Sequence, residues 1–250
     1  MIHSFLLIGQ SNMAGRGYLN EAIPVDPTNI RVMRNGRWQG MFRPVNHDRP
    51  FSGVNLAESF AERYAETYGV KVGIIPCADG GSALWQWEKG NILFENAVNH
   101  VRLAQRTSTV AGVLWHQGES DCAPADYQAY EEKFRKFLAD FREAADLWNV
   151  PFLVGGLGDF LPLREGTKTL MNYGKINEAL KNTARDLPLT GYVPAEGLGA
   201  NPDNLHFSAA ALYEFGHRYF EAWRVFEKEM AWLGDADKPE DDERTELELL

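Results

Sequence analysis

Short, continuously apolar runs alternate with amphipathic stretches along this chain of 250 residues, and this alternation limits the fold more than any other feature. Runs that are apolar at every position are typical of strands buried on both faces of a sheet. Their alternation with helices predicts an α/β fold, in which helices cover a parallel sheet. The strands are expected at Phe5–Gly9, Lys71–Cys77, Ala111–Trp115 and Phe152–Leu157, and less clearly near Ile30–Met33 and Gly191–Pro194.

The spacing of apolar residues also predicts the helices. Leu56, Phe60, Tyr64 and Tyr68 recur every four residues, and Gly69 supplies a stop signal. A short helix is expected after Ser11. The longer ones are expected from about Leu93 to Arg106, from Pro124 to Trp148, from Tyr173 to Leu187, and from the N-cap Ser208 to about Phe226.

The composition indicates one globular domain and an acidic tail. Hydrophobic residues make up 44% of the chain and charged residues 24%, which are ordinary globular values. From Asp235 to Leu250 there are eight acidic and two basic residues, a charge of 2 − 8 = −6. Repelling carboxylates with few apolar neighbours disfavour ordering. We predict a single domain over residues 1–233 and a flexible tail over residues 234–250.

The net charge and the apolar runs exclude several classes of partner. A formal charge of −10 argues against a surface for nucleic acid or for an anionic membrane, because both need a basic face. The run Phe5–Ile8 is too short for a signal peptide or a membrane span. We expect a cytoplasmic protein, or a secreted one if a leader has been removed. Cys77 and Cys122 fit neither a disulfide framework nor a zinc motif, and no oligomeric state is predicted.

Four polar clusters lie where predicted strands end or where the last helix begins. Three follow strands and read GQSNMAG from Gly9, ADGGS from Ala78 and HQGESD from His116, and the fourth reads DNLH from Asp203. In an open parallel sheet, ligands bind in the crevice at the carboxyl ends of the strands. We therefore expect the clusters to converge on one site.

These clusters contain the groups that acyl transfer requires. A serine hydroxyl is a weak nucleophile unless a neighbouring base takes its proton, so we pair Ser11 with His206. Asp203 is the candidate that orients the imidazole of His206 and stabilises the imidazolium. The backbone N–H groups of Ser11 and Gly81 and the side-chain amide of Gln117 are candidate donors to an oxyanion.

The motifs resemble the SGNH hydrolase superfamily, and within it the sialate O-acetylesterase and acetylxylan esterase branch, carbohydrate esterase family six. GQSNMAG, GGSALWQW, WHQGESD and DNLHFS follow one another over the chain up to about Trp223. The resemblance implies a three-layer α/β/α, flavodoxin-like domain that removes acetyl groups from sugar hydroxyls without a metal. It also implies that Ser11, Asp203 and His206 form the triad, with Gly81 and Gln117 as oxyanion donors.

Two positions depart from the superfamily pattern. Gln117 stands where the third block usually has asparagine, so its amide must reach with one more methylene. Glu119 is a second carboxylate that is a candidate to orient His206, although the short spacing to His206 favours Asp203. Trp85 and Trp87 are candidates to stack on a sugar ring, and burial in the core is the equal alternative.

We thus predict a serine esterase that deacetylates carbohydrates through an acetyl-enzyme intermediate, without predicting which sugar. The alternatives are a non-catalytic carbohydrate-binding protein on the same scaffold and a lipase or thioesterase of the same superfamily. Met13 breaks GxSxG, which disfavours an α/β-hydrolase elbow, and no GxGxxG or GK[ST] motif indicates a nucleotide. His116 and Glu119 form HxxE rather than HExxH, so we expect no metal and no cofactor.

Overall fold

The computed structural model describes residues 1–235, which form a seven-stranded sheet in the order β3-β2-β4-β1-β5-β6-β7. All neighbouring strands are parallel except the hairpin of β2 with β3. The segment β4-β1-β5-β6-β7 has the flavodoxin-like order, so the predicted three-layer fold is confirmed. The strands are β1 (Ile2–Gly9), β2 (Ile30–Arg34), β3 (Arg37–Gly40), β4 (Lys71–Pro76), β5 (Thr109–His116), β6 (Phe152–Gly155) and β7 (Thr190–Val193).

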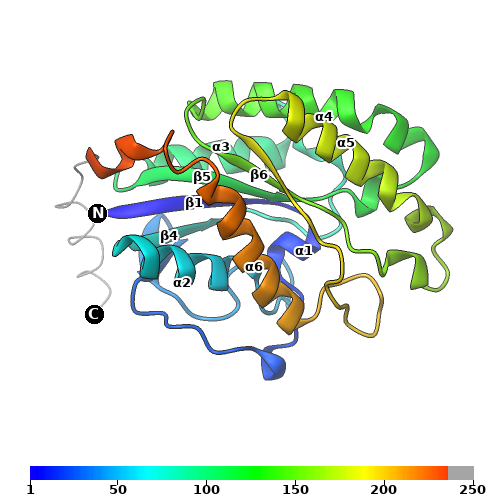
Figure 1. The fold of residues 1–250 in the computed structure, drawn as a ribbon, viewed down its shortest axis with the longest axis horizontal. Helices are drawn as coiled ribbons and strands as arrows, with labels where there is room; N and C mark the ends of the chain where they lie inside the picture. The colour runs from blue at the N-terminus through cyan, green and yellow to red at the C-terminus, as the bar shows by residue number, and fades with distance from the viewer. Residues whose placement is uncertain (236–250) are drawn as a thin grey trace.

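Helices cover both faces of the sheet. As Figure 1 shows, α2 and α6 lie on one face, and α3, α4 and α5 lie on the other. The four-residue helix α1 directly follows β1. The helices are α1 (Ser11–Ala14), α2 (Leu56–Tyr68), α3 (Ile92–Ala104), α4 (Pro124–Ala145), α5 (Tyr173–Asp186) and α6 (Ala209–Arg224). Short 3-10 turns include η2 (Leu84–Trp87) and η3 (Glu119–Asp121).

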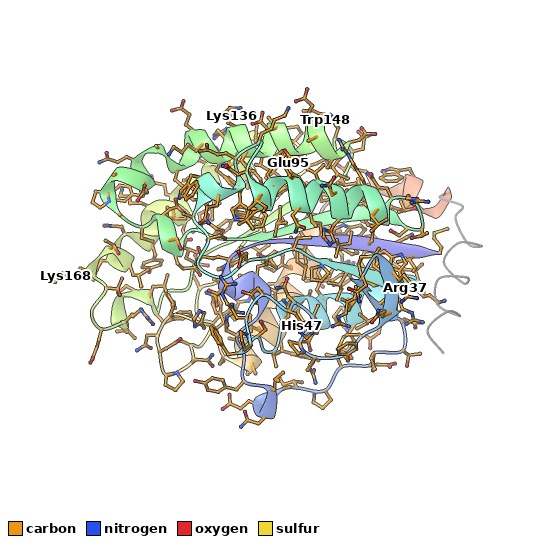
Figure 2. The ribbon with its side chains drawn as sticks, turned by 180° about the vertical axis from the view of Figure 1, so that it is seen from behind. Arg37, His47, Glu95, Lys136, Trp148 and Lys168 are labelled. Atoms are coloured by element: carbon orange, nitrogen blue, oxygen red, sulfur yellow. The ribbon has the colours of Figure 1, made fainter. Side chains whose placement is uncertain are left out.

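Helix α4 ends three residues earlier than the apolar spacing predicted. Asp146 adopts a left-handed conformation with φ of 53°, and its N–H caps the carbonyls of the last turn. The chain therefore leaves the helix before Trp148, which is 53% exposed instead of lying on the buried face. Figure 2 shows Trp148 at the surface, together with Glu95 and Lys136 on the outer sides of α3 and α4.

The edge strand β3 was missed by the search for apolar runs. It pairs with β2 through a two-residue turn formed by Asn35 and Gly36, both with positive φ (50° and 74°). Asn-Gly is a strong hairpin signal because both residues tolerate this conformation. The signal was present, but β3 is too polar to be found by hydrophobicity.

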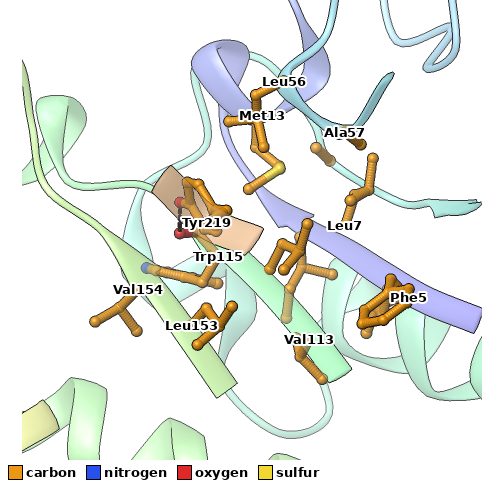
Figure 3. Packing of buried hydrophobic residues seen from close by; sticks show 14 of the residues in the cluster. Phe5, Leu7, Met13, Leu56, Ala57, Val113, Trp115, Leu153, Val154 and Tyr219 are labelled. Carbon is orange, nitrogen blue, oxygen red and sulfur yellow. Dashed lines mark hydrogen bonds between the residues drawn. The ribbon is translucent and has the colours of Figure 1, made fainter. Parts of the chain in front are cut away.

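The two central strands are buried along their whole length. Every residue of β1 and of β5 is buried. Figure 3 shows how Phe5, Leu7 and Val113 pack in this core, and how Tyr219 of α6 reaches Trp115. The hydroxyl of Tyr219 donates a 2.7 Å hydrogen bond to the carbonyl of Trp115. Each such large side chain contributes about 2 kcal/mol to the free energy of unfolding when it is buried, so β1 and β5 lie at the centre of the hydrophobic core.

The described part of the chain ends at Asp235, so nearly all of the predicted acidic tail (residues 234–250) lies outside the described residues. Cys77 and Cys122 are buried and unpaired with each other. Among residues 1–235, none of the helices has both the length and the apolar character that a membrane crossing needs.

Candidate active site

The structure brings the four polar clusters together at the carboxyl edge of β4, β1 and β5. The N–H of Gln10 donates to the carbonyl of His116 over 2.9 Å, and the N–H of Asp79 donates to the carbonyl of Gly9 over 3.0 Å. These bonds join the first three clusters directly. The fourth reaches them from the segment before α6.

The turn between β1 and α1 presents Ser11 at the start of a helix. Gly9 has φ of +129°, and a Cβ there would lie 2.1 Å from the carbonyl oxygen of His116, so only glycine fits. Ser11 is the first residue of α1 and is 7% exposed. Its backbone N–H lies at the helix N-terminus, where the first four N–H groups have no partner within the helix.

Ser11, His206 and Asp203 form a continuous chain of hydrogen bonds. Ser11 Oγ lies 3.0 Å from His206 Nε2, and His206 Nδ1 lies 2.6 Å from Asp203 Oδ2. An ionised carboxylate can only accept, so Nδ1 carries the proton and Nε2 is left to accept from the serine hydroxyl. The motifs predicted that Ser11 and His206 lie side by side, and the structure places them within hydrogen-bond distance.

Asp203 is stabilised in its ionised form. Its other oxygen, Oδ1, accepts the backbone N–H groups of Leu205 and His206, each over 3.0 Å. Partial burial opposes ionisation, but these bonds and the imidazole outweigh it and hold the pKa of Asp203 below its usual range. A charged Asp203 is the form needed to hold the imidazole.

Asn12, which sequence reasoning missed, ties the nucleophile helix to the segment that carries His206. We call residues 201–207 the histidine loop. Asn12 Nδ2 donates to the carbonyl of Leu205 and its Oδ1 accepts the N–H of Phe207, both over 3.1 Å. The side-chain amide of Asn12 therefore binds the backbone on both sides of His206. The motif GQSN contained the signal, since Asn12 adjoins Ser11.

Glu119 contacts Asn12 and not His206. Its Oε1 accepts the amide of Asn12 over 2.5 Å and lies 3.8 Å from Nδ1 of His116. The contacts therefore place Asp203, rather than Glu119, at the histidine. His116 is fully buried, and desolvation lowers its pKa, so its neutral ring bonds to the carbonyl of Gly156. Within residues 1–235, no three His, Cys, Asp or Glu side chains lie close enough to hold a metal ion.

A tight turn places Gly81 beside β1. We call residues 79–82 the glycine turn. The N–H of Ser82 donates to the carbonyl of Asp79 over 3.3 Å, and Gly81 has φ of +81°. Its N–H and that of Ser11 take part in no hydrogen bond with the described part of the chain. Two free backbone donors therefore lie in neighbouring segments at this edge.

The predicted oxyanion role of Gln117 does not fit its contacts. Gln117 is fully buried, and its amide nitrogen donates to Asp121 over 2.5 Å and to the carbonyl of Ser82 over 3.1 Å. Its amide oxygen accepts the hydroxyl of Tyr130 over 3.0 Å. Both amide protons are used within the protein, so Gln117 supports the glycine turn from below instead of facing a substrate.

The two candidate tryptophans differ in exposure. Trp87 is fully buried, its indole nitrogen donates to Ser82 Oγ over 3.0 Å, and its ring meets Trp115 edge to face. Of the two alternatives for Trp87, the structure agrees with burial in the core and not with stacking on a sugar, because its ring is enclosed by the protein. Trp85 is 57% exposed and keeps a free face.

A model of the family described as carbohydrate esterase, sialic acid-specific acetylesterase, matches residues 1–224. A probable carbohydrate esterase of Arabidopsis thaliana is 26% identical over 244 residues, which cover 88% of this chain and 89% of that protein. The crystal structure from the same plant superposes with a TM-score of 0.79, at 26% identity, over 89% of this chain and 98% of that one.

Two more distant structures share the fold. A carbohydrate acetylesterase of Xanthomonas citri has a TM-score of 0.66 at 22% identity and covers 89% of this chain and 56% of that one. The protein NanS has a TM-score of 0.69 at 19% identity, over 91% of this chain and 98% of that one.

Proposed function

The chain belongs to the sialic acid-specific acetylesterase family of carbohydrate esterases and is a carboxylic ester hydrolase acting on carbohydrates, and we propose that it works by a serine mechanism through an acetyl-enzyme. The proposed substrate is a sugar that carries an O-acetyl group. The family description makes acetylated sialic acids the first substrates to test, with acetylated xylan next.

In the first half-reaction, Ser11 Oγ attacks the acetyl carbonyl while His206 Nε2 takes its proton. The tetrahedral intermediate then collapses, the bond to the sugar oxygen breaks, and His206 returns the proton to that oxygen. Asp203 holds the ring in the required tautomer and stabilises the imidazolium. The sugar leaves, and the acetyl group stays on Ser11.

In the second half-reaction, water replaces the sugar. His206 takes a proton from the water, whose oxygen attacks the acetyl carbonyl, and the proton then returns to Ser11 as acetate leaves. In both steps, negative charge collects on the carbonyl oxygen. The N–H groups of Ser11 and Gly81 are the proposed donors to it, and each such donor is typically worth about 3 kcal/mol of barrier.

The observation that carries this proposal is the hydrogen-bond chain from Ser11 through His206 to Asp203. It joins residues far apart in the sequence, since Ser11 and His206 are separated by 195 positions. A capping serine and a surface histidine have no need of this contact, whereas a serine nucleophile requires it.

The first test is Ser11→Ala, with Ser59→Ala as the matched control. Ser59 is a buried serine whose hydroxyl bonds to the carbonyl of Tyr213 between α2 and α6. We expect Ser11→Ala to lose acetate release from acetylated sugars by about 10⁴-fold or more, and Ser59→Ala to retain it. A serine-directed fluorophosphonate should label the wild type and Ser59→Ala only.

Normal turnover in Ser11→Ala would overturn the serine mechanism. A series of esters of increasing acyl length checks the acetyl preference, because a lipase or thioesterase would prefer longer chains. Acetate release from defined acetylated sialic acids and xylo-oligosaccharides would then identify the sugar.

A further inference from the structure

The peptide between Gly80 and Gly81 has two ends that face in opposite directions. A trans peptide is planar, so the carbonyl of Gly80 and the N–H of Gly81 point to opposite sides. Whatever fixes the carbonyl of Gly80 also fixes the direction of the N–H that we assigned to the oxyanion. This peptide is the middle one of the glycine turn.

The middle peptide of such a turn has two orientations. Positive φ at Gly81, the third residue, is the type II form, and the type I form differs by rotating this peptide through about half a turn. Glycine at both central positions makes either form accessible. In the rotated form the carbonyl of Gly80 would take the place of the N–H of Gly81 and repel an oxyanion.

Arg49 binds the carbonyl that decides between the two orientations. Its Nη2 donates to the oxygen of Gly80 over 2.8 Å, and its Nη1 lies 2.8 Å from Oδ1 of Asp79. Nη1 also donates to the carbonyl of Asp48 over 2.7 Å. The guanidinium therefore spans the first two residues of the glycine turn and the loop before α2. Figure 2 shows this loop near the label of His47.

Asp48 binds the same glycine from its other side. Its Oδ2 accepts the N–H of Gly80 over 2.8 Å, and a buried ion pair with Arg16 keeps the carboxylate in place. A Cβ on Gly80 would lie 2.4 Å from Nη2 of Arg16 and 2.8 Å from Oδ2 of Asp48. Gly80 thus has its N–H and its carbonyl held by two consecutive residues of one loop.

From these contacts we infer that Arg49 is a positioning residue, which keeps the Gly80–Gly81 peptide in the orientation that aims the Gly81 N–H at the oxyanion. This inference rests on the proposed function. A cation on the carbonyl also polarises the peptide, because hydrogen bonds in series strengthen one another, and this makes the N–H a better donor. Nothing in the motif ADGGS reveals this role, because Arg49 lies 31 positions from Gly80.

The test compares Arg49→Met, Arg49→Lys and the control Arg43→Met. Arg43 precedes the same loop, but it binds Glu58 over 2.6 Å and the carbonyl of Ile23, and it does not contact the glycine turn. We expect Arg49→Met to lower kcat by about 10- to 100-fold with a smaller change in KM, since one oxyanion donor is worth up to about 10²–10³-fold. Arg49→Lys keeps a single charged donor and should recover part of the loss.

A second readout separates aiming from loop stability. A trifluoromethyl ketone adds to the serine and places its oxygen where the oxyanion forms, so its affinity should fall in Arg49→Met by about the same factor as kcat/KM. Arg43→Met should lower the thermal stability while kcat and the affinity for the ketone stay at the wild-type level.

Several outcomes would overturn the inference. One is a kcat and an affinity for the ketone within about twofold of wild type in Arg49→Met. Another is an equal loss of kcat in Arg43→Met. If Arg49→Met does not fold, Arg49→Lys decides, because full activity there would show that aiming needs no guanidinium. Ser11→Ala stays inactive in each of these cases, so failure of the inference is distinguishable from failure of the proposed function.

Discussion

The histidine loop and the glycine turn both contact residues 9–12, the loop at Ser11 and Asn12 and the turn at Gly9, but different kinds of group hold them in place. The histidine loop is held mainly by neutral amides, since Asn12 binds the backbone of Leu205 and Phe207 and the side chain of Asn201 donates to the carbonyl of Arg16 over 2.9 Å. Its one contact with an arginine side chain among the described residues is on the exposed side, where Arg164 donates to the carbonyl of Asp203 over 2.9 Å. Asp48 and Arg49 hold the glycine turn through charged groups. The side chain of Asp203 is 39% exposed, whereas that of Asp48 is 4% exposed.

This difference matches what each segment has to do. In the proposed mechanism the histidine loop gains and loses a charge in every cycle, and the partial exposure of Asp203 lowers the cost of that change, because charges are less stable in a fully buried site. The glycine turn only has to keep the N–H of Gly81 aimed, so it tolerates a buried ion pair. Preorganised dipoles act best where they do not reorient during the reaction.

The largest expected effect concerns the histidine loop. Asp203→Asn should lower kcat by about 10³–10⁴-fold, because a neutral amide neither fixes the tautomer nor stabilises the imidazolium. Glu119→Gln is the matched control, since Glu119 does not reach His206 and glutamine still accepts from Asn12. Steady-state kinetics of both variants check this, and a greater loss in Glu119→Gln would reverse the assignment.

The next effect concerns the glycine turn and acid. Asp48→Asn should lower the free energy of unfolding by about 3 kcal/mol at neutral pH, because it leaves Arg16 buried without its charged partner. Burial opposes ionisation of Asp48, but bonds from Arg16, Ser52 and Gly80 outweigh it and lower the pKa of Asp48. A lowered pKa means that this stability is fully present above about pH 4 and is lost as the pH falls through the folded-state value.

Urea unfolding of the wild type and of Asp48→Asn between pH 7 and pH 3 measures this acid dependence. The difference between the two proteins in free energy of unfolding should stay constant near pH 7 and become smaller toward pH 3. A gap that widened with acid would mean that Asp48 is not ionised in the folded protein.

A smaller effect is expected for the two hydrogen bonds that Asn12 makes to the histidine loop. Asn12→Ala removes both hydrogen bonds to the histidine loop and should lower kcat by about 10- to 100-fold, since the imidazole of His206 is then no longer held in position beside Ser11. Asn12→Asp can still accept the N–H of Phe207 but can no longer donate to the carbonyl of Leu205, and its kcat should be equal to or lower than that of Asn12→Ala. Unchanged kcat in Asn12→Ala would show that Asn201 and Asp203 suffice to hold the loop.

The smallest change in kcat is expected below the glycine turn. Gln117→Met should destabilise the fold by about 2 kcal/mol, because Asp121 and the hydroxyl of Tyr130 lose a buried partner. The kcat of the folded fraction should stay within about threefold of wild type, since the amide has no free proton for an oxyanion. A loss of 100-fold or more would restore Gln117 as a donor.

The elements of this fold were readable from the sequence because their signals are local. The four-residue spacing of Leu56, Phe60 and Tyr64 and the unbroken apolar run of β1 need no knowledge of the rest of the chain. The end of α4 depended on the left-handed conformation of Asp146, which a carboxylate residue adopts only in some contexts.

The same distinction between local and context-dependent signals applies to the candidate site. Motif order located Ser11 and His206, because each motif lies at a strand end or a helix start. It did not give the direction of a side chain, so Gln117 was placed in the site and Trp87 was left undecided between site and core, although both point into the protein. Arg49 was missed because its role exists only through a backbone carbonyl in a distant turn.

The long separation along the chain between Ser11 and His206 has a consequence during synthesis. At about 5–20 residues per second, the ribosome makes the 195 positions between them in about 10–40 s. Throughout that interval the nascent polypeptide carries Ser11 without the proposed general base, His206. In the proposed mechanism, ester hydrolysis therefore cannot begin before the chain has been made as far as His206, directly ahead of α6, the helix that packs beside α2.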